Sequence, residues 1–366
     1  MKDQKKITQL IGRVIIITYI SLSCFSCVAQ KILQVGIAGL AHDHVHGILN
    51  QYKKGEVLIS GIAEGDEKLV QRYKKTYQLP DSLFYKDLKT LLSHTRPDVI
   101  LAYTPINEHI SVVEACAPAG ISVMVEKPLA TTVKDSERMA VLSKQFHIYV
   151  LTNYETTWYN SNQQIYEMVN TRHAIGSIRK MTVHDGHNGP KEIGCSPDFL
   201  SWLTDPKQNG GGALMDFGCY GANLMVWLMN GKSPMSVTAL THHLKSEIYP
   251  RVEDDATILL EYPDATGIIE ASWDWPFGIK DLEVFGTKGY LHALNNNTLQ
   301  QREKDSSVLV VVQPATYTNN LQYLTDVLNG KLDPGHDLSS LENNLIVVRI
   351  LESALKSARE GKKIIL

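Results

Sequence analysis

Two groups of residues in this sequence have the types and spacing that acid–base chemistry requires. In the first group, Lys127 lies between Glu126 and Pro128, directly after the apolar run 121–125. A lysine at the end of a buried strand loses part of its hydration, which lowers the pKa of its amine. Such an amine can exchange a proton with a substrate hydroxyl. The alternative is a surface lysine in a turn, which is the more common situation in proteins.

The second group is a polar stripe in the otherwise apolar segment 212–231. Asp216, Tyr220 and Asn223 follow the spacing i, i+4, i+7, which places them on one face of a predicted helix. Burying such polar groups is costly unless they are paired or face a cavity. We therefore expect them to face a site, although a helix with its polar face in water is the alternative.

A third motif, residues 39–44, matches a dinucleotide-binding loop only in part. Gly39 keeps the first glycine of the fingerprint, Ala41 replaces the second and His44 the third. Glu64 ends the next apolar run, where a carboxylate can accept hydrogen bonds from both ribose hydroxyls of adenosine. The same carboxylate would repel a 2′-phosphate, and Gly65 follows it in place of an arginine. The pattern favours NAD over NADP.

Three histidines in this loop make a metal site the alternative to a dinucleotide-binding loop. His42 and His46 could share one face of a helix, but His44 would point away from them. No cysteine or carboxylate pair nearby completes a tetrahedral set, so we predict no metal. We expect His42 and His44 to be polar residues at a helix start, near the cofactor phosphates.

The elements that position these residues divide into two regions. Buried apolar runs alternate with helical patterns from residue 32 to residue 152, which predicts βαβ units, a parallel sheet and a Rossmann domain. From residue 153 to residue 366, short strands joined by tight turns predict an open, mostly antiparallel sheet, with a helix over 212–231 and two C-terminal helices. The predicted fold class is α/β, with an N-terminal Rossmann domain and a C-terminal α/β domain.

The order of these motifs resembles the Gfo/Idh/MocA oxidoreductases, which include glucose–fructose oxidoreductase and inositol dehydrogenase. The resemblance spans nearly all of the chain after residue 30. It rests on VGIAGL, TPINEH at 104–109, EKPLA at 126–130, the helix with Asp216 and Tyr220, VEDDATILLEYPDATGIIEASW and FGTKGYL. It implies NAD or NADP, a sugar, polyol or related substrate, and a homo-oligomer formed through the open sheet. Tyr220 stands where many members have histidine, as in the branch similar to dimeric dihydrodiol dehydrogenase.

The resemblance also implies roles for single residues. Lys127, Tyr220 and Asp216 would be catalytic: Tyr220, its pKa lowered by the Lys127 ammonium, would take the substrate hydroxyl proton, and Asp216 would orient Lys127 or a neighbouring sugar hydroxyl. The predicted cofactor-binding residues are Gly36, Gly39, Ala41, His42, Glu64, Thr104, Pro105, His109, Glu126 and Lys127. The predicted substrate-binding residues are Trp158, His187, Asn223 and Trp273, although core packing is the more usual use of tryptophan.

The composition and the N-terminal segment limit the possible cellular location and binding partners of the protein. The formal net charge of −3 gives no broad attraction to nucleic acid. Residues 1–29 combine a basic start with a short apolar run, which predicts a signal peptide and export to the periplasm or the cell envelope. Cys24 or Cys27 could carry a lipid anchor, and no later segment predicts a membrane span.

Export leaves three functions open, because free NAD is scarce outside the cytoplasm. The first is a dehydrogenase acting on a sugar, polyol or glycoside. The second is a redox-neutral enzyme that cleaves or epimerises glycosides through a transient keto sugar on tightly bound NAD. The third is an inactive sugar-binding or scaffold protein. Lys127, Tyr220 and Glu64 argue against the third.

Overall fold

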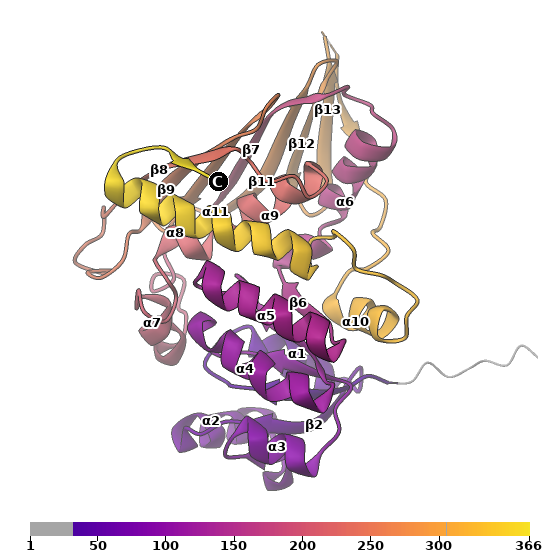
Figure 1. The fold of residues 1–366 in the computed structure, drawn as a ribbon, viewed down its shortest axis with the longest axis vertical. Coiled ribbons are helices and arrows are strands. Elements are labelled where there is room, and N and C mark those ends of the chain that lie inside the picture. Colours follow the sequence, from indigo (N-terminus) through magenta and orange to yellow (C-terminus); the bar gives the residue numbers. More distant parts are fainter. Residues whose placement is uncertain (1–31, 305) are drawn as a thin grey trace, which may run out of the picture. The chain divides into compact units, whose positions relative to one another are not determined.

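The computed structural model describes residues 32–304 and 306–366 (Figure 1). The predicted signal peptide, with Cys24 and Cys27, lies outside the described residues. Six parallel strands form the first sheet in the order β3-β2-β1-β4-β5-β6. Their bounds are β1 Gln34–Ala38, β2 Leu58–Ala63, β3 Phe84–Tyr85, β4 Val99–Ala102, β5 Ser122–Glu126 and β6 Val150–Asn153. The sequence predicted all of these except β3, whose two residues are too short to form a pattern.

Helices flank this sheet, and several begin with a side-chain cap. The helices are α1 Val45–Lys53, α2 Glu67–Tyr77, α3 Leu88–His94, α4 His109–Cys116 and α5 Val133–Phe146. Asp66, Asp87 and Thr132 each accept a hydrogen bond from a backbone N–H in the first turn of α2, α3 and α5. Strands β4 and β5 are buried at every position, as expected for a parallel sheet covered on both faces.

The second sheet has nine strands in the order β14-β13-β12-β11-β7-β10-β9-β8-β15. The bounds are β7 Ile178–Gly186, β8 Ser236–His242, β9 Asp255–Glu261, β10 Thr266–Ser272, β11 Ile279–Gly286, β12 Tyr290–Asn295, β13 Thr298–Glu303, β14 Ser306–Val310 and β15 Ile364–Ile365. All neighbours are antiparallel except β7 and β10, which pair in parallel. The predicted mostly antiparallel sheet is therefore confirmed, whereas β13, β14 and β15 are strands that the sequence did not predict.

The predicted helix over 212–231 is two helices. α8 Ala213–Asp216 and α9 Gly218–Leu228 are separated at Phe217. Every residue of both helices is buried, and α9 contacts both β7 and β10. Gly221 permits this close approach, because a Cβ there would lie 2.6 Å from a side-chain carbon of Ile269. The break matters for the site because it frees the backbone carbonyl of Asp216 from regular helix geometry.

Four further α-helices and one π-helical turn belong to the described residues. They are α6 Asn160–Tyr166, which continues as the single π-helical turn η5 Glu167–Thr171, then α7 Pro197–Leu203, α10 Asn320–Leu328 and α11 Leu341–Glu360. Although α10 follows the second sheet in sequence, its Leu324 and Val327 belong to the same buried cluster as Val35 and Ile37 of β1. α10 therefore packs on the core of the first sheet, and the boundary at residue 153 stays a prediction. Among the described residues, no helix is long and apolar enough to cross a membrane.

Candidate active site

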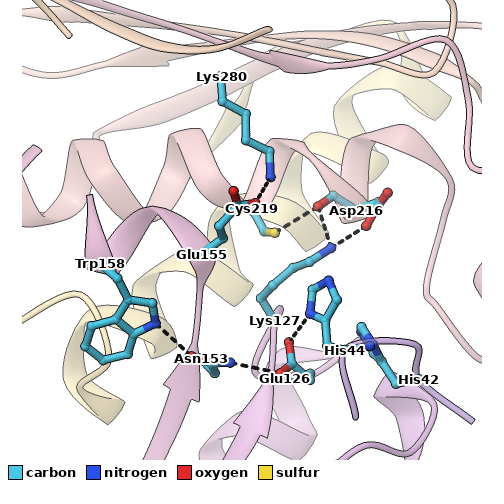
Figure 2. Close-up of polar contacts among 10 residues, drawn as sticks. All are labelled: His42, His44, Glu126, Lys127, Asn153, Glu155, Trp158, Asp216, Cys219 and Lys280. Carbon is cyan, nitrogen blue, oxygen red and sulfur yellow. Dashed lines mark hydrogen bonds and ion pairs between the residues drawn. The ribbon is translucent and has the colours of Figure 1, made fainter. Parts of the chain in front are cut away.

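Lys127 and Asp216 form a buried ion pair between the end of β5 and the break between α8 and α9. The ammonium contacts Asp216 Oδ1 and donates a second hydrogen bond, 3.1 Å long, to the Asp216 carbonyl (Figure 2). Both side chains are only 7% exposed. Trp273 completes the arrangement, because its indole N–H donates to Asp216 Oδ2 over 3.0 Å. Residues 89 positions apart thus meet at one point, as the sequence predicted for Lys127 and Asp216.

The charge state of this pair differs from the prediction. Burial disfavours the Lys127 ammonium, but the Asp216 carboxylate outweighs it and raises the pKa of Lys127. In the same way burial opposes ionisation of Asp216, yet Lys127 lowers its pKa. The predicted lowering of the Lys127 pKa is wrong because the sequence could not show that a carboxylate is in direct contact with the amine.

Tyr220 has two cations near its ring. The Lys127 ammonium is 5.2 Å from the centroid of the Tyr220 ring, and the Lys280 ammonium is 4.5 Å from it. The phenol makes no hydrogen bond within the described part of the chain, so it is free to contact a ligand. Burial nevertheless raises its pKa well above the ordinary value. The prediction that Lys127 lowers this pKa is therefore wrong: desolvation of the phenolate and the nearby carboxylates, Asp185 first among them, raise the pKa.

A second lysine–carboxylate pair, which the sequence did not reveal, borders the same ring. Lys280 on β11 forms an ion pair with Glu155, which begins the short helical turn Glu155–Trp158 after β6. The register of β11 against β7 places Lys280 opposite Asp185. Asp185 is 1% exposed, and its Oδ1 has no hydrogen-bond partner. Burial raises its pKa to about 8. Strand pairing between distant segments creates this cluster, and no local motif could have signalled it.

The partial glycine loop forms the wall of a cavity of about 580 Å³, the cofactor cavity. Gly39 has φ +80°, and a Cβ there would lie 3.1 Å from the backbone nitrogen of Thr104. Glu64 holds the loop, accepting hydrogen bonds of 2.8 Å from the N–H groups of Leu40 and Asp66. Five predicted cofactor residues line the cavity: Gly39, Ala41, Glu64, Thr104 and Pro105. A glycine turn beside a carboxylate at the carboxyl ends of β1 and β2 fits the adenosine half of NAD.

Two family models match this chain. One, described as an oxidoreductase family with an NAD-binding Rossmann fold, matches residues 31–154. The other, the GFO/IDH/MocA C-terminal domain, matches residues 162–292. The chain belongs to the Gfo/Idh/MocA family. The predicted family, the fold class and NAD as the cofactor are thereby confirmed, and the chain is an NAD(P)-dependent oxidoreductase acting on CH–OH groups.

Individual relatives are similar at low identity. Trans-1,2-dihydrobenzene-1,2-diol dehydrogenase from Xenopus laevis is 21% identical over 309 residues, 81% of this chain and 89% of that protein. The structure of aldose-aldose oxidoreductase from Caulobacter crescentus in complex with glycerol has a TM-score of 0.76 at 23% identity, covering 92% of this chain and 100% of that one. An inositol dehydrogenase homologue from Azotobacter vinelandii in complex with NAD⁺ has a TM-score of 0.78 at 18% identity, covering 92% and 98%. These structures share the fold.

In this Gfo/Idh/MocA member, His42 and His44 are arranged differently from the prediction that His44 points away from His42. His42 and His44 do not diverge, since their ring centroids are 4.4 Å apart. Helical spacing does not apply to them because α1 begins only at Val45. His44 bonds Glu126 over 2.8 Å, and ligand atoms of His42, His44 and Glu126 lie within 4.8 Å of one another. However, His42 Nδ1 already accepts the His44 backbone N–H at 3.2 Å, which leaves the proton on Nε2 and no free lone pair for a metal.

His42 and Asp43 attach the loop to the C-terminal region instead. The His42 ring packs against Phe199 and Trp202 of α7, with centroids 4.7 and 5.3 Å away. Asp43 accepts hydrogen bonds from the backbone N–H and the hydroxyl of Ser196 at 2.8 and 2.6 Å. Burial lowers the pKa of His42 well below its ordinary value, so this ring is neutral. The predicted contact of His42 with a cofactor stays a prediction.

Two predicted cofactor residues lie behind the cofactor cavity rather than on its wall. Gly36 is inside β1, where a Cβ would lie 2.4 Å from a side-chain carbon of Ile100, so its role is packing. His109 is fully buried and bonds the carbonyl of Leu129 over 3.1 Å. Burial lowers the pKa of His109 to about 4. This neutral histidine supports the segment after Lys127 from behind.

The four predicted substrate residues separate into two groups. Asn223 and Trp273 are fully buried: Asn223 donates to the Leu338 carbonyl over 2.8 Å, and Trp273 supports Asp216. Asn223 faces the protein interior because every residue of α9 is buried, and Trp273, directly after β10, is buried against Asp216. The predicted substrate contacts of both stay predictions. Trp158 and His187 are partly exposed. Trp158 donates to Asn153 Oδ1 at 3.1 Å, and His187 packs edge-on against Phe217 at 4.9 Å.

Proposed function

We propose that this chain is an exported enzyme that transfers a hydride between NAD and a carbinol carbon of a sugar, polyol or glycoside. The observation that carries the proposal is the convergence of Lys127 and Tyr220, with Asp216 behind the lysine. An ammonium and a free phenol side by side can bind and protonate a substrate oxygen. The carbohydrate class is supported by the relatives, among them an aldose-aldose oxidoreductase.

The cofactor would lie with its adenosine half against Gly39 and Glu64, and when bound it accepts or returns the hydride. Lys127 stays an ammonium because Asp216 raises its pKa, so it stabilises negative charge on the substrate oxygen. Tyr220 stays protonated and acts as the acid when a carbonyl is reduced. The nearby ammonium groups of Lys127 and Lys280 then stabilise the phenolate that remains. Oxidation of the carbinol is the reverse, with the hydroxyl proton returning to the phenolate.

Export of the chain favours a redox-neutral version of the same chemistry as a second candidate. The supporting observation is the basic and apolar pattern of residues 1–29, with Cys24 or Cys27 available for a lipid anchor. In this candidate, tightly bound NAD would supply reversible hydride transfer, so that a sugar could become a transient ketone, undergo elimination or epimerisation beside it, and be reduced again without net oxidation. This scheme uses the same Lys127, Asp216 and Tyr220.

One experiment separates these functions. The purified mature chain is denatured, and the supernatant is assayed for NAD. The native protein is then tested with sugars and glycosides. Released NAD together with net NAD reduction on a sugar supports the dehydrogenase, whereas released NAD with glycoside cleavage and no net reduction supports the redox-neutral enzyme. If no nucleotide is released and none binds on addition, both are contradicted and the scaffold interpretation holds.

We further propose that the open face of the second sheet joins copies of this chain into an oligomer. Leu240, Leu259 and Phe285 on β8, β9 and β11 are 60%, 42% and 38% exposed on that face. Leu259→Glu should lower the mass measured by sedimentation, because a charge on this face opposes burial against a second copy. Glu114→Gln, on α4, is the control. An unchanged mass for Leu259→Glu, or a monomeric parent protein, would contradict this proposal.

A further inference from the structure

A second cavity, of about 680 Å³, lies apart from the cofactor cavity and from the catalytic residues. Its walls are α6 and η5 on one side and the segments 313–317 and 332–338 on the other. None of its lining residues lines the cofactor cavity, and Lys127, Asp216 and Tyr220 are not among them. Its volume falls in the range of small-molecule sites, which is roughly 300–1,000 Å³. The cavity is therefore large enough for one or two sugar rings.

Aromatic rings form much of its wall. Tyr166 and Trp227 stack on each other with centroids 4.3 Å apart and an interplanar angle of 17°. Tyr323 meets the rings of Trp158 and Tyr317 edge-on, each at 5.5 Å. These contacts hold the rings in place before any ligand arrives. Rigid aromatic walls bind the C–H faces of a ring-shaped ligand at low entropic cost.

The polar groups of the second cavity are mainly amides, hydroxyls and carboxylates. Among the described residues that line it, none is lysine or arginine, and one, His336, is a histidine. Glu167 and Asp337 are carboxylates, and Glu167 is paired with Arg172 at 2.7 Å. Asp337 is held in place by the Tyr323 hydroxyl at 2.7 Å and by the Ser339 N–H at 2.9 Å. Gln163 and Gln164 add amides that both donate and accept hydrogen bonds. The wall therefore suits a ligand with many hydroxyls and no negative charge.

We propose that the second cavity is a binding site for an uncharged sugar ring, separate from the catalytic cluster. Aromatic faces would cover the C–H faces of the ring, while the amides and carboxylates would bond its hydroxyls. Binding here does not require turnover, so this proposal can be tested independently of the proposed reaction.

The second cavity is joined to the active site by a short chain of hydrogen bonds. The Trp158 indole N–H donates to Asn153 Oδ1 at 3.1 Å, and the Asn153 amide donates to Glu126 Oε1 at 2.9 Å (Figure 2). Glu126 directly precedes Lys127 in the chain. A sugar against Trp158 would thus be three side chains away from the catalytic lysine, which suits the retention of a glycan near the site of its oxidation.

Filling the cavity tests the proposal. Ala315 lines it, and its contact with Asn160 is made by the Ala315 backbone N–H at 2.8 Å, so Ala315→Trp adds bulk without removing that bond. Val311→Trp is the matched control, because Val311 is 79% exposed and does not line the cavity. Both variants are first compared with the parent in thermal melting and in NAD content, to establish that they fold.

Calorimetric titration with methyl glucoside, methyl galactoside, methyl mannoside and cellobiose then measures binding. We expect at least one neutral sugar to bind the parent and Val311→Trp, with one fewer molecule bound per chain, or none, in folded Ala315→Trp. We expect glucose 6-phosphate to bind this site at least about tenfold more weakly, since like charges repel. Equal binding by Ala315→Trp and the parent would overturn the proposal, and so would no binding of any of these sugars to the parent at about 10 mM.

Where Ala315→Trp does not fold, Tyr317→Ala replaces it. The loss of one aromatic face should weaken neutral-sugar binding by about tenfold. Unchanged affinity in that variant would overturn the proposal as well. Because the readout is binding, failure of the proposed reaction would appear separately, as bound sugar without turnover.

Discussion

Two lysine–carboxylate pairs border the ring of Tyr220, and they differ in their distance from water. Lys127 and Asp216 are each 7% exposed, and Trp273 occupies the second oxygen of Asp216. In the other pair the side chain of Lys280 is 24% exposed and that of Glu155 is 53% exposed. The first pair is part of the interior of the protein, whereas the second lies partly in solvent.

The difference determines what each pair contributes. Breaking a buried pair leaves one charge without compensation in a medium of low polarity, which is strongly destabilising. A pair that water can reach is screened, and its loss changes little. Lys127 is therefore fixed in position and in charge, while Lys280 can exchange its partner for a ligand. The ring of Tyr220 thus has a permanent cation and an adaptable one beside it.

Removal of Lys127 should have the largest effect. In Lys127→Ala we expect turnover to fall by about 10³-fold with NAD still bound, because the cation that stabilises charge on the substrate oxygen is lost. The free energy of unfolding should fall by about 3–5 kcal/mol, since Asp216 stays buried without its partner. Steady-state kinetics, NAD content and urea denaturation measure these changes.

The double variant Lys127→Met, Asp216→Asn separates the two effects. It removes both charges, so stability should recover to within about 1–2 kcal/mol of the parent while turnover stays low. Parent-like turnover in the double variant would contradict the role of Lys127.

Replacement of the Tyr220 hydroxyl should have the next largest effect. Tyr220→Phe should lower turnover by about 10²-fold, because the acid that protonates the substrate oxygen is removed. The melting temperature should hardly change, since the hydroxyl bonds no described residue. Kinetics and thermal melting measure both. A variant with full activity would assign the proton transfer to Lys127 alone.

The pH dependence of stability at Asp185 shows whether the Lys280 ammonium, already paired with Glu155, also compensates the Asp185 carboxylate. The folded-state pKa of Asp185 is about 8, against an ordinary value of 3.8, because burial disfavours its charged form. Between these values the folded chain keeps a proton that the unfolded chain releases, so Asp185 lowers stability progressively as pH rises. Asp185→Asn should therefore gain stability over the parent progressively from about pH 4 to about pH 8, and the difference should then level off.

Urea denaturation at a series of pH values measures this difference. A difference between Asp185→Asn and the parent that does not change with pH would show that Lys280 compensates Asp185 after all. The description of Lys280 as a cation that compensates Glu155 but not Asp185 would then be wrong.

The smallest effect is expected for Glu155. In Glu155→Gln the unfolding free energy should change by less than about 1 kcal/mol, because the pair is partly exposed. Turnover should change by less than about tenfold, since Lys280 remains over the Tyr220 ring. Glu114→Gln is the control, because it removes a carboxylate of similar exposure from its pair with Arg138. A loss as large as that of Lys127→Ala would show that the two pairs are equivalent.

The sequence by itself determined the parts of this protein that depend on local pattern. Apolar runs separated by helices predicted the Rossmann sheet, and the same runs placed Glu64 and Lys127 at strand ends, where parallel strands present their residues to a common edge. The four-residue spacing of Asp216 and Tyr220 predicted two residues of one site, and the glycine loop predicted NAD. Each of these inferences uses residues within about twenty positions of one another.

Only the tertiary structure decided which groups meet and how strongly they are desolvated. Lys280 and Asp185 come together through strand pairing across 95 positions, given by the register of β11 against β7. The same packing placed Asn223 in the interior, although its helical spacing predicted that it faces the site. It also raised the pKa of Tyr220, although the neighbouring Lys127 predicted a lowered pKa. Burial and charge contacts are sums over segments far apart in the chain, so no short stretch of sequence contains them.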